Sequence, residues 1–124
     1  MTLSATVENG MLNVTGSIDA TMAADGDFKL RIMIAEDLIT IDDAPGGTNG
    51  ETEYHHVFKG FVGGSEGIDL ENTWADGDSY TIDESFDIST LTIYHYDGLE
   101  VIAIVQNDDD KYVHQAVKDD EVDI

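Results

Sequence analysis

Two-residue alternation of apolar and polar side chains is the feature that most constrains how this 124-residue chain folds. This period places every second side chain on the same face of a pleated strand. Between residues 27 and 37, for example, Leu30, Ile32 and Ile34 alternate with residues of the opposite face. The pattern recurs about seven times along the chain, and no segment shows a helical period. It therefore predicts an all-β fold.

Turn signals separate the alternating runs. Asn9-Gly10 divides the first run in the way of a two-residue hairpin turn, which requires positive φ. A closing hairpin is expected from residues 99–107 and 112–118, and the remaining strands over 27–37, 53–62 and 79–88. Residues 42–50 are expected to form the longest loop, and residues 68–77 fit no clear pattern.

Seven short strands with turns between them predict an immunoglobulin-like antiparallel β-sandwich. The length fits one domain, which we place at residues 1–118. Residues 119–124 are expected to be an acidic, disordered tail, because like charges repel and few side chains there could anchor it.

The charge balance limits the partners. Twenty-seven acidic residues and five lysines and arginines give a net charge of −22, while 41% of the residues are hydrophobic. The apolar share is enough for a core, so we expect the acids at the surface, possible partners being divalent ions or a cationic protein. Nucleic acid is excluded as a partner, because its affinity depends on basic side chains at phosphates.

The longest strongly apolar run, residues 101–105, is too short for membrane insertion. A saline habitat would also suit this surface, and the oligomeric state stays open.

Candidate metal ligands come from the acidic turns and the histidines. Asp108, Asp109 and Asp110 form the densest acidic turn, and clustered carboxylates attract calcium. The alternative is a solvated turn, because aspartate is common throughout this chain. His55 and His56 are adjacent in an expected strand and should point to opposite faces, so a histidine site would need partners brought in by the fold, such as His95 or His114.

Other chemistry is less well supported. The chain has no cysteine, which removes disulfides and thiol catalysis. No nucleophile elbow, Walker loop or dinucleotide fingerprint occurs, so we expect this chain to have no enzymatic activity. We also expect it to bind no cofactor other than calcium. Trp74, Tyr94 and Tyr96 are candidates for stacking on a sugar ring if they lie on an open face.

Four landmarks occur in order along the chain. They are residues 34–39, the segment Tyr54-His55-His56-Val57-Phe58-Lys59, residues 101–107 ending in Gln106-Asn107, and residues 112–116 ending in Gln115-Ala116. Together they resemble the C-terminal β-sandwich of the Omp-twenty-eight-related outer-membrane protein family. The family motif would correspond to Tyr54, His56, Val57, Lys59, Gln106, Asn107, Gln115 and Ala116.

The resemblance implies a non-catalytic accessory or interaction module of an exported bacterial protein, located in the cell envelope or outside the cell. Members of that family often carry a thioredoxin-like region and an export signal, and this chain shows neither. It would then be an excised or mature domain. The alternative is a sandwich that binds carbohydrate or calcium.

Overall fold

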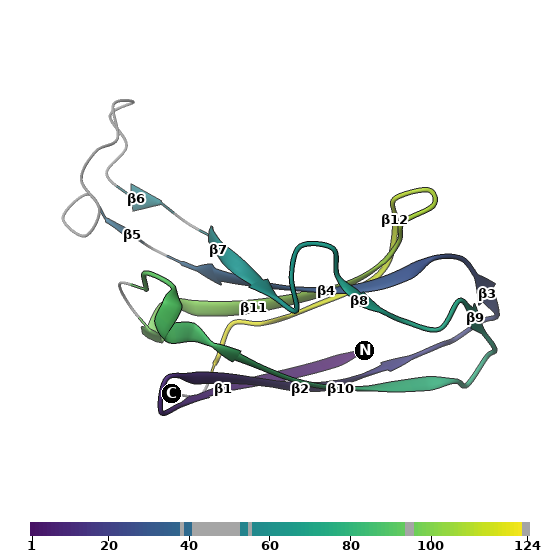
Figure 1. Cartoon of the computed structure of the whole chain (residues 1–124), viewed down its shortest axis with the longest axis horizontal. Coiled ribbons are helices and arrows are strands. Elements are labelled where there is room, and N and C mark those ends of the chain that lie inside the picture. The colour runs from purple at the N-terminus through teal and green to yellow at the C-terminus, as the bar shows by residue number, and fades with distance from the viewer. Residues whose placement is uncertain (38, 41–52, 55, 94–95, 123–124) are drawn as a thin grey trace.

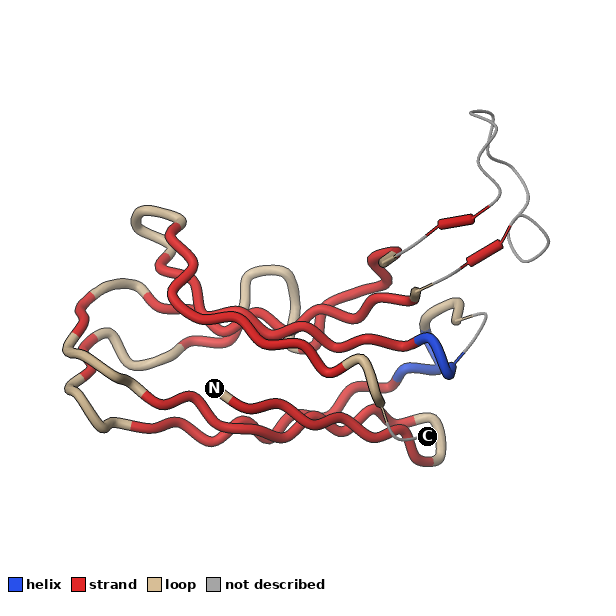
Figure 2. Tube along the Cα trace, turned by 180° about the vertical axis from the view of Figure 1, so that it is seen from behind, coloured by secondary structure: helices blue, strands red, loops and turns tan. Residues whose placement is uncertain are grey.

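The molecule is an all-β sandwich of antiparallel sheets, as the alternation predicted (Figure 1). The structure, a computed structural model, describes residues 1–37, 39–40, 53–54, 56–93 and 96–122. Figure 2 shows the two layers from behind, with the strands running along the length of the molecule. The finer assignment to the immunoglobulin type stays a prediction.

In the described part of the chain, seven strands of six or more residues build the two layers. The long strands are β1 (Thr2–Glu8), β2 (Met11–Asp19), β4 (Phe28–Glu36), β7 (Val57–Val62), β10 (Ser79–Asp87), β11 (Leu99–Asn107) and β12 (Tyr112–Asp119). The short elements are β3 (Ala24–Asp25), β5 (Ile39–Thr40), β6 (Glu53–Tyr54), β8 (Ile68–Asp69), β9 (Thr73–Trp74) and the 3₁₀ turns η1 (Ile88–Thr90) and η2 (Tyr96–Gly98).

One layer has the strand order β1-β2-β10, and the other has the order β12-β11-β4-β7 with β8 also paired to β4. Two small ribbons, β3-β9 and β5-β6, extend from opposite ends of the sandwich (Figure 1). Strands β4 and β11 run through the middle of the larger sheet and pair along nine positions, from Leu99 opposite Glu36 to Asn107 opposite Phe28. These two strands therefore reach both ends of the molecule.

The core lies between the layers and follows the alternation. Leu30, Ile32 and Ile34 of β4 are fully buried, and they face Leu12 and Ile82 in one continuous apolar cluster. Burying a side chain of this size contributes about 1.5–3 kcal/mol to folding. The core is thus large enough to hold the sandwich together without disulfides.

The turns largely agree with the expectations from sequence. Asn9 and Gly10 have φ of 52° and 78°, which confirms the hairpin turn. The loop expected at residues 42–50 lies outside the described residues. The unclear segment contains β8 and β9, whose residues are too few to give a readable period.

The C-terminal strand continues one residue past the expected end of the domain. Asp119 is the last residue of β12, and its Oδ2 accepts a hydrogen bond of 2.9 Å from the backbone N–H of Ala5 in β1. Val122 packs against the core cluster. Within the described part of the chain, no helix has the length and apolar character needed to span a membrane.

Candidate metal centre

Asp37, His56 and Glu100 converge at the end of the larger sheet. One ligand atom from each of the three lies within 4.8 Å of the other two. His56 Nδ1 lies 3.0 Å from Glu100 Oε2. Imidazole nitrogen and carboxylate oxygen are both common ligands of divalent metal ions, so this group is a candidate metal centre.

Strand register explains why these three residues meet. Glu100 of β11 lies opposite Ala35 of β4, which in turn lies opposite Phe58 of β7. Asp37 is two positions beyond Ala35, and His56 is two positions before Phe58. Asp37 directly follows β4 and His56 directly precedes β7, so the pairing of β11, β4 and β7 brings both positions to the same end of the sheet as Glu100.

Backbone contacts hold the two carboxylates close together. The N–H of Asp37 donates to the carbonyl of Gly98 at 2.8 Å, which extends the pairing of β4 and β11 by one step. A Cβ at position 98 would lie 2.6 Å from the carbonyl oxygen of Asp37. Glycine at this position therefore permits the backbone segments at Asp37 and Gly98 to approach each other closely beside the site.

The site combines a buried acid with an accessible base. The side chain of Glu100 is 5% exposed and that of His56 is 59% exposed. A buried carboxylate requires a compensating partner, and the imidazole provides one at hydrogen-bond distance. An ion approaching from solvent would meet His56 first and Glu100 last.

His56 has a left-handed backbone, with φ of 52°. Such a conformation costs a residue with a Cβ about 1–3 kcal/mol, and it is concentrated at functional sites. His56 immediately precedes β7, and its conformation is part of how the imidazole reaches Glu100.

A second ion pair adjoins the site. Lys59 is the extra residue of a β-bulge, because Ile34 pairs with Gly60 and Ala35 pairs with Phe58. Its Nζ lies 3.8 Å from Oε1 of Glu36, whose side chain is completely buried. The bulge thus supplies a positive charge at the end of β4, where two consecutive acids occur.

The ligand types favour a transition metal over calcium. Calcium takes six to eight oxygen ligands, whereas imidazole suits zinc, copper, iron and nickel. Two ligands of a tetrahedral zinc ion, each about 2.0–2.1 Å from the metal, are separated by about 3.3 Å. The 3.0 Å between His56 Nδ1 and Glu100 Oε2 is close to that spacing. Three protein ligands would leave the fourth position for water.

The three aspartates singled out for calcium take part in separate contacts. Asp108 accepts two hydrogen bonds from Arg31, at 2.7 and 3.0 Å. Asp109 accepts from the N–H of Asp27 at 3.2 Å, and Asp110 accepts from the N–H of Tyr112 at 2.8 Å. These contacts stabilise the turn and join it to β4, and calcium binding there stays a prediction.

Arg31 is the centre of a charged network on the outer side of the larger sheet. Hydrogen bonds from its guanidinium lower the pKa of Asp108 from its ordinary value of 3.8, and the same bonds raise the pKa of Arg31. Lys29 forms ion pairs with Asp69 and Asp27, and its hydrogen bond to Asp69 is the main cause of its raised pKa. The network gathers both basic residues of β4.

The aromatic candidates do not form an open stacking face in the described structure. Trp74 is buried, at 8% exposure, and its indole N–H donates to the carbonyl of Glu71 at 2.7 Å. Tyr96 is 38% exposed in η2. Tyr94 lies outside the described residues. The burial of Trp74 weakens the prediction of a sugar-stacking face, which would require coplanar exposed rings.

The remaining motif residues have separate positions. Gln106 accepts from Arg31 at 3.0 Å, and Asn107 accepts from the N–H of Asp109 at 3.0 Å within the turn. The amide nitrogen of Gln115 donates to the carbonyl of Asp19 at 3.0 Å. Tyr54 belongs to β6, and its side chain lies outside the described set.

Of the three residues, only His56 was a candidate ligand from the sequence; Asp37 and Glu100 were not. Its expected partners were His95 and His114. His95 is outside the described residues, and the ring of His114 packs edge-on against Phe28 and Tyr112. A usable signal was present, because Glu100 is a charge between the apolar Leu99 and Val101 of a central strand. Such an isolated charge indicates a partner across the sheet.

Comparisons with known proteins gave no match to any family model, curated protein or solved structure.

Proposed function

We propose that this chain is a β-sandwich module that binds one divalent transition metal ion at Asp37, His56 and Glu100. The observation that carries the proposal is the convergence of three ligand atoms within 4.8 Å, from β11 and from the ends of the adjacent strands β4 and β7. Zinc is expected to bind more tightly than manganese, following the general order of divalent affinities. The acidic surface would favour the approach of a cation.

The competing explanation is that His56 only forms an ion pair with the buried Glu100. Both explanations predict that removing His56 changes stability. Only the metal site predicts saturable zinc binding with one ion per chain. Isothermal titration calorimetry of zinc into chelator-treated protein separates the two.

We expect His56→Ala and Glu100→Gln each to weaken zinc binding by about tenfold or more, since even outer partners of metal ligands contribute about 10–100-fold. Two matched controls remove the same chemical groups elsewhere. His114→Ala removes a histidine that contacts Phe28 and Tyr112, and Glu71→Gln neutralises an exposed carboxylate. Both controls should bind zinc like the unmodified chain. Equal affinity in His56→Ala and the unmodified chain would refute the site.

Calcium is tested by thermal unfolding of His56→Ala and of two variants in the acidic turn. If calcium raises the melting temperature at fixed ionic strength, and Asp108→Asn and Asp110→Asn remove that effect while His56→Ala does not, the acidic turn is the calcium site. If His56→Ala removes it, calcium shares the centre proposed here.

The role as an accessory module of an exported envelope or surface protein is proposed from the family resemblance and the acidic surface. Sequencing the gene around this segment tests it. An export signal upstream in the same reading frame would support the proposal, and a gene product retained in the cytoplasm would contradict it.

A further inference from the structure

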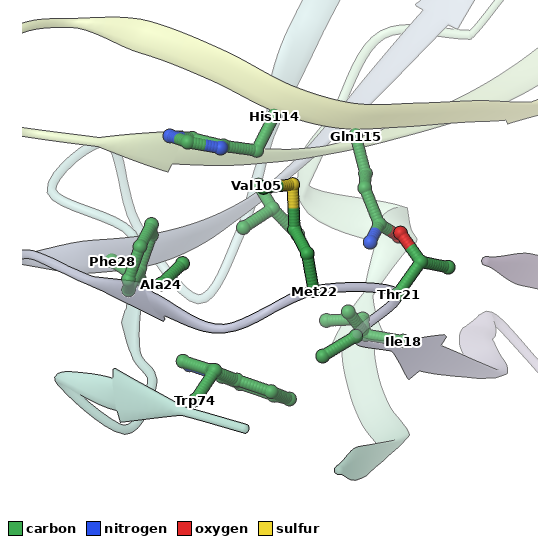
Figure 3. A pocket seen from close by; sticks show the side chains of 10 residues that line it. Ile18, Thr21, Met22, Ala24, Phe28, Trp74, Val105, His114 and Gln115 are labelled. Atoms are coloured by element: carbon green, nitrogen blue, oxygen red, sulfur yellow. The ribbon is translucent and has the colours of Figure 1, made fainter. Parts of the chain in front are cut away.

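A second site lies at the opposite end of the sandwich, near the β3-β9 ribbon. A cavity of about 120 Å³ opens there between the two layers. Figure 3 shows Phe28, Trp74 and Met22 around this space, with His114 and Gln115 of β12 along one side. The full lining consists of Ile18, Ala20, Thr21, Met22, Ala24, Phe28, Trp74, Val105, His114 and Gln115.

The lining is mainly apolar and aromatic, and it differs from the acidic surface in its charge. None of these ten residues is an aspartate or a glutamate, in a chain with twenty-seven such residues. The two aromatic rings of Phe28 and Trp74 and the thioether of Met22 offer favourable contacts to an aromatic ligand. A cationic ligand would find no compensating carboxylate among the lining residues.

Gln115 contributes an unmet hydrogen-bond acceptor. Its Oε1 is buried and has no hydrogen-bond partner among the described residues. Its amide nitrogen donates to the carbonyl of Asp19 at 3.0 Å, and this contact fixes which side of the amide carries the oxygen. Burying an acceptor without a partner costs about 1–3 kcal/mol, so a ligand with a donor would gain by supplying one.

The size of the cavity limits the ligand to about one ring. A cavity of ~150 Å³ lined by apolar side chains holds a benzene molecule. The space here is of the same order and also opens to solvent. We infer that this cavity binds a small neutral aromatic molecule with one hydrogen-bond donor, of the phenol class, whose hydroxyl donates to Gln115 Oε1.

Trp74 makes the test direct, because it is the single tryptophan of the chain and lines the cavity. Phenol is titrated into the protein while tryptophan emission is followed, with excitation at wavelengths where phenol does not absorb. We expect a saturable change for one phenol per chain. Benzene should bind about five- to tenfold more weakly, because it cannot donate to Gln115.

Two variants test separately the hydrogen bond to Gln115 and the space available in the cavity. Gln115→Met keeps the length of the side chain but removes the acceptor, so phenol and benzene should bind it equally. Ala24→Leu fills part of the cavity and should weaken both ligands at least tenfold. Asp83→Asn, an exposed residue of β10 that does not belong to the lining, serves as the control and should retain the preference for phenol.

The unmodified chain alone can overturn the proposal, whether or not the variants fold. Nuclear Overhauser effects are expected between the phenol ring and both the Trp74 indole and the Met22 methyl group. A linear emission change without saturation would refute the site. Equal affinity for phenol and benzene would refute recognition by Gln115, and saturable binding without those Overhauser effects would place phenol elsewhere. In each of these cases the proposal fails, independently of the metal centre.

Discussion

Asp108 illustrates how one residue can have a role different from that of its neighbours in an acidic turn. Two hydrogen bonds from Arg31 lower its pKa, so the carboxylate is more stable in the folded chain than in the unfolded one. Its contribution to stability is therefore fully present above the ordinary pKa of 3.8, and it is lost as the pH falls through the lowered value.

We predict that Asp108→Asn lowers the melting temperature at neutral pH, and that the difference from the unmodified chain disappears in strong acid. Asp76→Asn is the matched control, because Asp76 is exposed and the substitution changes the net charge equally. Thermal unfolding over a pH series measures both. The assignment would be wrong if the two variants had the same melting temperature at neutral pH.

The individual sites were harder to predict from sequence than the strands. Aspartate is so common here that sequence alone does not distinguish Asp108, which binds Arg31, from Asp110, which binds the N–H of Tyr112. Glu100 and Asp37 are far apart in the chain, and their meeting with His56 depends on the pairing of three strands. Pair-specific contacts of this kind follow from register, which the alternation alone does not determine.

At the scale of the element, the strands were predictable because each carries its own signal. The alternation in β4 and β10 and the Asn9-Gly10 turn are local features, and the structure contains all three. Residues 68–77 were unclear because β8 and β9 have only two residues each, which is too short for a period.

The pairing of β1 with β2 depends on Gly16. A Cβ at this position would lie 2.1 Å from the backbone carbonyl oxygen of Thr2, which has no freedom to move without shifting β1. We predict that Gly16→Ala lowers the free energy of unfolding by about 1–3 kcal/mol, the usual cost of overpacking. Urea unfolding gives the value, with the exposed neighbouring change Thr15→Ala as control. A cost no larger than that of Thr15→Ala would show that β1 adapts freely.

At the scale of the whole molecule, the net charge of −22 opposes folding through self-repulsion. Salt screens such repulsion, with a Debye length of about 10 Å at 0.1 M and about 3 Å at 1 M. We predict that the melting temperature rises by several degrees between these sodium chloride concentrations, although salt weakens ion pairs such as Lys29 with Asp27. Sodium chloride and potassium chloride should act alike. A melting temperature that falls with salt would show that the ion pairs outweigh the repulsion.

Asp119 has a consequence for how separate molecules behave toward one another. The outer edge of β1 would otherwise present its N–H groups to a strand of another copy, which is how sheets extend into aggregates. By accepting the hydrogen bond from Ala5, the carboxylate occupies one of those groups and places a negative charge on the edge. Both features oppose the pairing of β1 with a strand of another molecule.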